Sequence, residues 1–174
     1  MSPERNQYRI SFDEIVANAK EITLKDGHHV PILIVEGSKD LLTSQISEMP
    51  ETHGERMQLM RFLGQAAAKS GMVGNLEQVF FISEGWMSTA SQDKPPNIRP
   101  SVDPNRKEVL IISGLRVKDS RKNIRLFEMA RDQNKQIVSL EQLLPPQEKD
   151  GRIEVPLLEA FAQGFKLAYQ LRYN

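Results

Sequence analysis

The chain has 174 residues with 23 basic and 23 acidic side chains, so its formal net charge is zero. This balance argues against a nucleic-acid partner, because nucleic-acid-binding domains usually carry a basic excess. The sequence contains no cysteine, which excludes disulfide bonds, thiol nucleophiles and cysteine-bound metals.

Periodicity and turn residues predict an α+β class with a mainly antiparallel sheet of about five or six strands and three helices. The predicted order is α-β-β-α-β-β-β-β-α, in a single domain over residues 1–174. Capping boxes at Ser11 and Thr52 mark two helix starts, and Asp26 and Gly27 between strand-like runs are typical of a β-hairpin. In chain order we expect a helix at about 12–20, strands at 21–24 and 30–35, a turn of helix within 39–46, a helix at 53–70, strands at 79–82, 107–117, 123–131 (with helix as the alternative) and 136–140, and a helix at 156–170.

Two apolar runs, 79–82 and 109–112, predict neighbouring central strands. Both runs are continuous, which indicates that both faces of the sheet are covered. Alternation along the first run places Phe80 and Ile82 on one face, followed by Glu84. If the two strands pair antiparallel, their polar ends meet at one end of the sheet.

The segment between these strands, 88–105, holds four of the ten prolines. Unstructured loops longer than ~12–15 residues are uncommon and are usually either functional or disordered, and both alternatives stay open here. Residues 1–10 are mostly polar, and we expect them to be poorly ordered.

Charged residues gather where the two central strands end: Glu84, Asp103, Arg106 and Glu108, with Trp86 beside them. Two carboxylates brought close can bind a divalent cation or serve as acid and base. An arginine beside them can hold an anionic substrate. The alternative is a structural ion pair of Arg106 with Glu108 or Asp103 that pins the loop.

No complete catalytic, metal or nucleotide motif is present, so the sequence leaves open whether the protein is an enzyme, and it predicts no cofactor. The histidines lack the spacing of metal ligands, and we expect His28 and His29 to be solvated at the hairpin tip. The sequence shows neither a membrane-spanning apolar run nor a signal peptide, so we expect no membrane partner and a cytoplasmic location.

Three stretches, at 26–28, 84–87 and 103–108, resemble a group of uncharacterised bacterial proteins. That group shares a Glu-Ala-Trp-Met-like stretch, where this chain has Gly85 in place of alanine, and an Asp-Pro-x-Arg-x-Glu-like stretch. The resemblance covers about residues 20–118. It implies no activity, and it directs attention to the same five charged and aromatic side chains.

Two hypotheses about function follow. In the first, a non-enzymatic domain acts through protein–protein contact, as a homodimer, because a catalytic set is missing and the surface is of mixed polarity. In the second, a small-molecule or metal-dependent enzyme has its pocket under the 88–105 loop. Glu84 and Glu108 would then be bases or metal ligands, Arg106 an anion clamp and Trp86 a wall.

Overall fold

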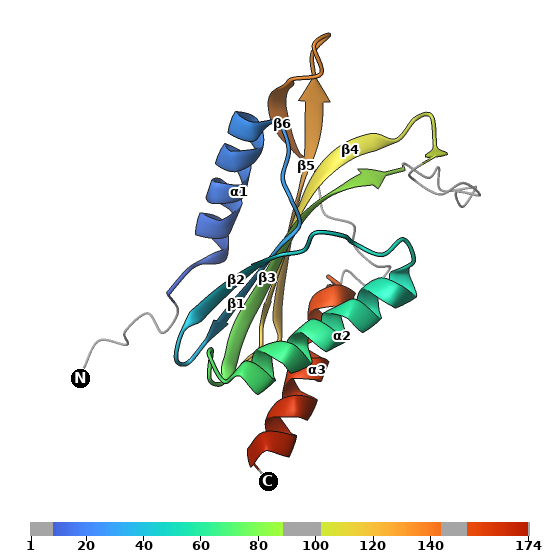
Figure 1. Cartoon of the computed structure of the whole chain (residues 1–174). Coiled ribbons are helices and arrows are strands. Elements are labelled where there is room, and N and C mark those ends of the chain that lie inside the picture. The colour runs from blue at the N-terminus through green and yellow to red at the C-terminus, as the bar shows by residue number, and fades with distance from the viewer. Residues whose placement is uncertain (1–8, 89–101, 144–152, 174) are drawn as a thin grey trace.

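A six-stranded sheet carries one helix on one face and two helices on the other (Figure 1). This computed structural model describes residues 9–88, 102–143 and 153–173. The sheet order is β2-β1-β3-β4-β5-β6, and every neighbouring pair is antiparallel. The predicted class, element order and sheet type are therefore confirmed. The elements are α1 (Phe12–Asp26), β1 (Ile32–Gly37), β2 (Leu41–Gln45), α2 (His53–Ser70), β3 (Leu76–Met87), β4 (Lys107–Arg116), β5 (Arg121–Arg131), β6 (Ile137–Leu143) and α3 (Pro156–Tyr173).

The two apolar runs are neighbouring central strands, as predicted. They lie within β3 and β4, where Ile82 pairs with Ile112 and Trp86 pairs with Glu108. The antiparallel pairing brings the polar ends of both strands to the same end of the sheet. Most of the loop between them, residues 89–101, lies outside the described residues.

The hairpin predicted around Asp26 and Gly27 is wrong. Residues 21–24 continue α1 as helix, and Gly27 is its C-cap, with φ 75° and an N–H that donates to the Thr23 carbonyl oxygen. A glycine with positive φ serves a hairpin turn and a helix C-cap equally well, so the dipeptide alone does not distinguish them. Burial decides the matter, because Thr23 lies on the same buried side of the helix as Ala19.

The two strands before α2 are therefore right in number but displaced along the chain. They are β1, which overlaps the predicted strand at 30–35, and β2, where we expected a turn of helix. Ile34 pairs with Thr43 in this hairpin. Because β2 is a short edge strand of mixed polarity, its own sequence carries little strand pattern, and pairing with β1 determines its conformation.

Residues 1–8, most of the segment that we expected to be poorly ordered, lie outside the described residues, whereas Arg9 and Ile10 make hydrogen bonds to the sheet. The carboxyl group of Glu36, which is fully buried, accepts the Arg9 N–H at 2.6 Å. The side-chain amide of Gln78 donates to Glu36 and to the Ile10 carbonyl oxygen, both at 2.7 Å. This buried polar group fixes the start of the described chain to β1 and β3.

Alternation along β3 divides its side chains between two cores. Phe80 and Ile82 pack under α1, whereas Val79 and Phe81 pack under α2 and α3. The continuous apolar run thus reflects a sheet covered on both faces, as the sequence indicated.

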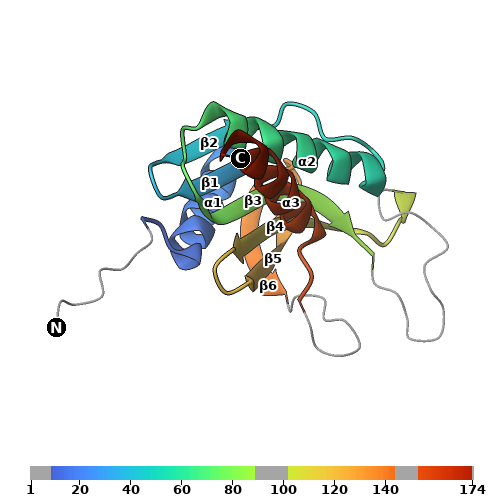
Figure 2. The same cartoon turned by 90° about the horizontal axis from the view of Figure 1, so that it is seen from below.

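The helices α2 and α3 touch backbone to backbone. A Cβ added to Gly64 would lie inside van der Waals distance of the Phe161 carbonyl oxygen, and a Cβ on Gly164 would meet the Arg61 carbonyl oxygen. Nearer their ends, Arg172 donates to the Ala68 carbonyl oxygen. The two helices therefore run side by side in the same direction, and both begin near the same end of the sheet (Figure 2).

Candidate functional site

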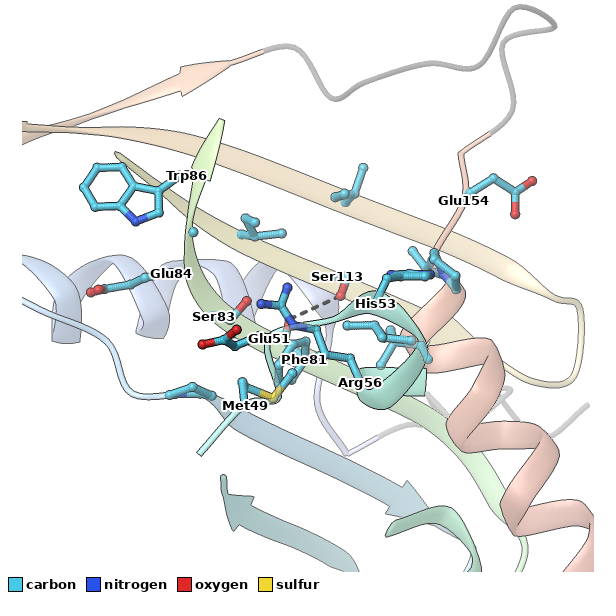
Figure 3. A pocket seen from close by; sticks show the side chains of 18 of the residues that line it. Met49, Glu51, His53, Arg56, Phe81, Ser83, Glu84, Trp86, Ser113 and Glu154 are labelled. Atoms are coloured by element: carbon cyan, nitrogen blue, oxygen red, sulfur yellow. Dashed lines mark hydrogen bonds between the residues drawn. The ribbon is translucent and has the colours of Figure 1, made fainter. Parts of the chain in front are cut away.

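A cavity of about 730 Å³ lies between the sheet and the starts of α2 and α3. We call it the α2–α3 cavity (Figure 3). Its floor comes from alternate residues of β3, β4 and β5, which face this side of the sheet because side chains alternate along a strand. The floor residues are Phe81, Ser83, Gly85, Ile111, Ser113 and Ile124.

Arg56, in the first turns of α2, supplies the cationic group of this cavity. Its Nε donates to the Pro50 carbonyl oxygen at 2.6 Å. Among the described residues its two terminal nitrogens have no partner. Ser83 and Ser113 line the same cavity as Arg56 (Figure 3), and the Ser113 hydroxyl donates to the Phe81 carbonyl oxygen at 3.3 Å.

The two helix starts at the cavity differ in their capping. At α2, the Thr52 side chain accepts from the Glu55 N–H. The Glu55 carboxylate accepts from the Thr52 hydroxyl and from the Thr52 N–H, and these two bonds lower the pKa of Glu55. At α3, the first helical bond runs from the Glu159 N–H to the Val155 carbonyl oxygen at 3.0 Å. Val155 has no side-chain acceptor, so the first free N–H groups of α3 lack a cap from this residue.

Three of the five residues singled out from the sequence border this cavity at the strand ends: Glu84, Trp86 and Glu108. They alternate with the floor residues, so the partners of Glu84 and Glu108 lie on the α1 side of the sheet. Arg106 does not line it but stacks on Trp86, with the guanidinium carbon 4.4 Å from the ring centroid. Asp103 lies outside the cavity as well, and the Ser88 hydroxyl and the Asn105 N–H hold the pKa of its carboxyl below the usual value.

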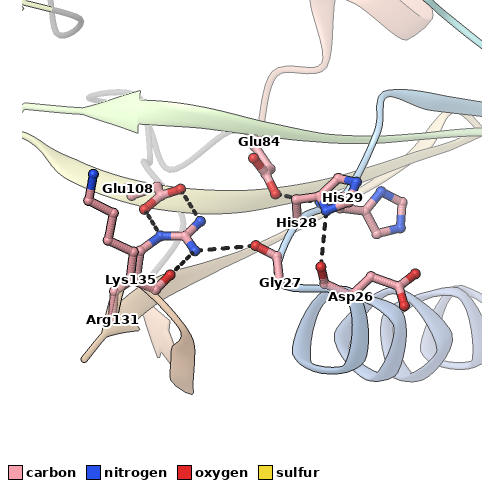
Figure 4. A network of polar contacts seen from close by, with 8 residues as sticks. All are labelled: Asp26, Gly27, His28, His29, Glu84, Glu108, Arg131 and Lys135. Atoms are coloured by element: carbon pink, nitrogen blue, oxygen red, sulfur yellow. Dashed lines mark hydrogen bonds and ion pairs between the residues drawn. The ribbon is translucent and has the colours of Figure 1, made fainter. Parts of the chain in front are cut away.

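Two carboxylates, Glu108 and Asp103, were considered as partners of Arg106 in a structural ion pair. Glu108 is not that partner, because it binds Arg131 (Figure 4). Arg131 holds both carboxylate oxygens of Glu108 at 2.6 Å, and it also donates to the carbonyl oxygens of Gly27 and Lys135. Arg106 donates to the Asp103 carbonyl oxygen, and its charge adds to the hydrogen bonds from Ser88 and Asn105 that lower the pKa of the Asp103 carboxyl. Glu108 thus belongs to a junction between β4, β5 and the end of α1, and no sequence spacing pointed to Arg131.

The expectation that both adjacent histidines are solvated is wrong for one of them. His29 is only 4% exposed, whereas His28 is exposed. The His29 N–H donates to the Glu84 carboxylate (Figure 4). Its Nδ1 lies 2.7 Å from the Val30 carbonyl oxygen, and its buried Nε2 has no partner within the described part of the chain. Glu84 therefore anchors the segment between α1 and β1 through one of its oxygens.

A second cavity, of about 680 Å³, lies between α3 and the β4–β5 end of the sheet. Apolar groups line much of it, among them Leu115, Phe165 and Tyr169. At its rim Lys122 binds Glu159 at 2.7 Å, and this carboxylate raises the pKa of Lys122. The ion pair joins α3 to β5 and so helps to hold α3 against the sheet beside this second cavity.

Within residues 9–88, 102–143 and 153–173, no three histidine or acidic side chains gather closely enough to hold a metal ion. In the same ranges no helix has the length and apolar character needed to cross a membrane.

The comparison with protein families is decisive for classification. A family model described as bacteriophage lambda protein ea47 matches residues 1–167. The chain belongs to this family. No curated protein and no solved structure matches it. The resemblance drawn from the sequence is confirmed only in part, because the match shows a family but does not show the motifs on which that resemblance rested.

Sequence reasoning missed two residues that give the α2–α3 cavity its polar character, Arg56 and Ser113. Arg56 follows a capping box and looks like an ordinary solvated helix residue, and Ser113 interrupts an apolar strand. Only the interruption of the apolar run by Ser113 was a visible sign, because a hydroxyl in a central strand needs a hydrogen-bond partner or a cavity.

Proposed function

We propose that this protein binds a small organic molecule in the α2–α3 cavity. The observation that carries the proposal is a cavity of about 730 Å³ whose apolar floor is combined with an arginine that has unused donors. Small-molecule sites are typically concave, about 300–1,000 Å³ in volume, and mostly apolar with a few placed polar groups. The cavity meets each of these conditions.

Binding is supported better than catalysis. Glu108 has both oxygens held by Arg131, and Arg106 stacks on Trp86 instead of facing the carboxylates. Glu84 keeps one oxygen without a partner among the described residues, so a role as a base remains the alternative proposal. A thermal-shift series across divalent cations and anions tests it. No shift in the parent protein, or an equal shift in Glu84→Gln, counts against catalysis or metal binding at Glu84.

A fragment screen by protein-observed NMR tests the binding proposal directly. Fragments should shift resonances of the cavity floor, and Ser83→Trp should abolish these shifts by filling the cavity. The matched control is Val138→Trp, because Val138 is an exposed strand residue on β6 and does not line the cavity. Circular dichroism establishes that both variants fold. Fragments that bind the two variants equally would contradict the proposal.

Self-association is a second proposal, and it carries over the expectation of a homodimer. Three large apolar side chains on α2 and α3 support it, because Phe62, Leu167 and Leu171 are 65%, 56% and 84% exposed. Size-exclusion chromatography with light scattering is the test, and a strict monomer at high concentration counts against it.

The lack of cysteine supports a cytoplasmic location.

A further inference from the structure

We propose that the α2–α3 cavity selects small organic anions, in which a carboxylate or phosphate group is joined to an apolar body, and that Arg56 holds the anionic group. This inference rests on the proposed function, because it names the class of ligand for the same cavity. Four observations support it. Arg56 has unused hydrogen-bond donors, and the start of α3 presents free N–H groups. Most nearby carboxylates are bound to other residues, and the floor of the cavity is largely apolar.

Arg56 presents donors that the protein itself does not use. Its Nε is fixed on the Pro50 carbonyl oxygen at 2.6 Å, which orients the planar group. The two terminal nitrogens have no partner in the described part of the chain. Two parallel N–H donors match a carboxylate or phosphate in a bidentate geometry, and a guanidinium remains charged at all ordinary pH values.

The start of α3 adds positive potential beside Arg56. Leu157 and Leu158 line the cavity, and Val155 offers no side-chain oxygen to their N–H groups. Free N–H groups at a helix start favour an anion, both as donors and through the helix dipole. The start of α2 is already satisfied by its capping box, so it contributes less.

Most carboxylates around the cavity are engaged elsewhere. Glu108 binds Arg131, and Glu154 binds Lys122 at 3.4 Å. Glu84 accepts from the His29 N–H. Glu51 is the exception, since it lines the cavity with no ion pair among the described residues. Its charge opposes an incoming anion, so removing it should strengthen anion binding.

The floor supplies a surface for the apolar body of the ligand. Phe81, Ile111 and Ile124 line it, and Trp86 stands at the strand ends with Arg106 stacked on its ring. A ligand that has an aromatic ring next to its anionic group would use both parts of the cavity, since apolar burial and charged hydrogen bonds act together there.

The experiment is an NMR titration of the full chain with four probes that share one ring: benzoate, phenyl phosphate, benzyl alcohol and benzylammonium. We expect the better of the two anions to bind at least about tenfold more tightly than benzyl alcohol. One hydrogen bond to a charged group contributes enough binding free energy to account for a tenfold difference in affinity. The benzoate and phenyl phosphate arms distinguish a carboxylate ligand from a phosphate ligand.

Variants then assign the anion to Arg56. Arg56→Gln should remove the preference for anions and leave benzyl alcohol binding unchanged, and Arg56→Lys should restore part of it. Arg61→Gln is the matched control, because Arg61 is an exposed residue of the same helix outside the cavity. Glu51→Gln should strengthen anion binding about two- to fivefold, as expected for one nearby charge.

The outcomes separate this inference from the proposal on which it rests. If benzyl alcohol binds in the cavity as tightly as the anions do, the ligand class is overturned and the proposed function stands. If anion binding persists in a folded Arg56→Gln variant, the role of Arg56 is overturned. If none of the four probes binds, both proposals fall together.

Discussion

The two faces of the sheet are built from the same strands but are closed to different extents. On the α1 face, Ile15 and Ala19 of the helix meet Phe80, Leu110 and Ile112, all of which are buried. On the opposite face, α2 and α3 form a close pair over β1 and β3 and leave the strand ends of β3, β4 and β5 open to a cavity.

This difference follows from how the helices pack. The α2–α3 pair is joined through Gly64 and Gly164, so its tightest contact is between helices. A pair that is bound to itself can cover one part of a sheet and leave the rest bare, whereas a single helix must lie along the apolar surface that it buries. The face with incomplete cover is where a ligand can enter.

The largest expected effect comes from neighbouring isoleucines on β4 that face opposite sides. Ile112 is fully buried under α1, and Ile111 is half-buried on the cavity floor. Ile112→Ala should lower the free energy of unfolding by about 2–5 kcal/mol, because it leaves a void in a closed core. Ile111→Ala should cost less than half of that. Urea unfolding measures both, and equal losses would contradict the difference between the faces.

A smaller loss is expected where α2 meets α3. Gly64→Ala should lower the free energy of unfolding by about 1–3 kcal/mol, because the added methyl meets the Phe161 backbone, which cannot move aside as a side chain can. Gly54→Ala in the same helix has open space around the new methyl and is the control. Denaturant midpoints decide the matter, and a neutral Gly64→Ala would mean that the helices are not in close contact.

The junction around Arg131 should contribute less again. Glu108→Gln keeps the shape of the side chain but removes the charge that Arg131 holds, so we expect a loss of roughly 1–2 kcal/mol. Arg131→Met and the double variant complete a cycle that isolates the pair. A coupling energy near zero would show that the junction does not help to close the α1 side.

The smallest effect is expected at the turn between β4 and β5, which serves as a reference outside both faces. Hydrogen bonds from Arg116 lower the pKa of Asp119 from 3.8 to about 2. The ionised pair therefore stabilises the fold above pH 3.8, and this contribution is lost as the pH falls to about 2. Asp119→Asn should be less stable than the parent at pH 6, the difference should shrink as the pH falls to 2, and a constant difference between these pH values would contradict the assignment.

Part of the candidate site was accessible from the sequence. The strand ends that carry Glu84, Trp86 and Glu108 could be placed together because two apolar runs had to pair across a single loop. The partners of these side chains could not be placed, because Arg131 reaches Glu108 from 23 residues away and His29 reaches Glu84 from 55. Such distances along the chain leave no local pattern.

The same division holds for the whole molecule. Local chemistry determined the α2 helix, the two central strands, the covered sheet and the number of elements, because capping boxes and periodic burial act over a few residues. Tertiary structure alone decided that residues 21–24 are helical, that β2 is a strand, and that Arg56 faces a cavity. In each of these cases the outcome depends on how one element packs or pairs against another, and that packing forms only when the sheet and its helices assemble.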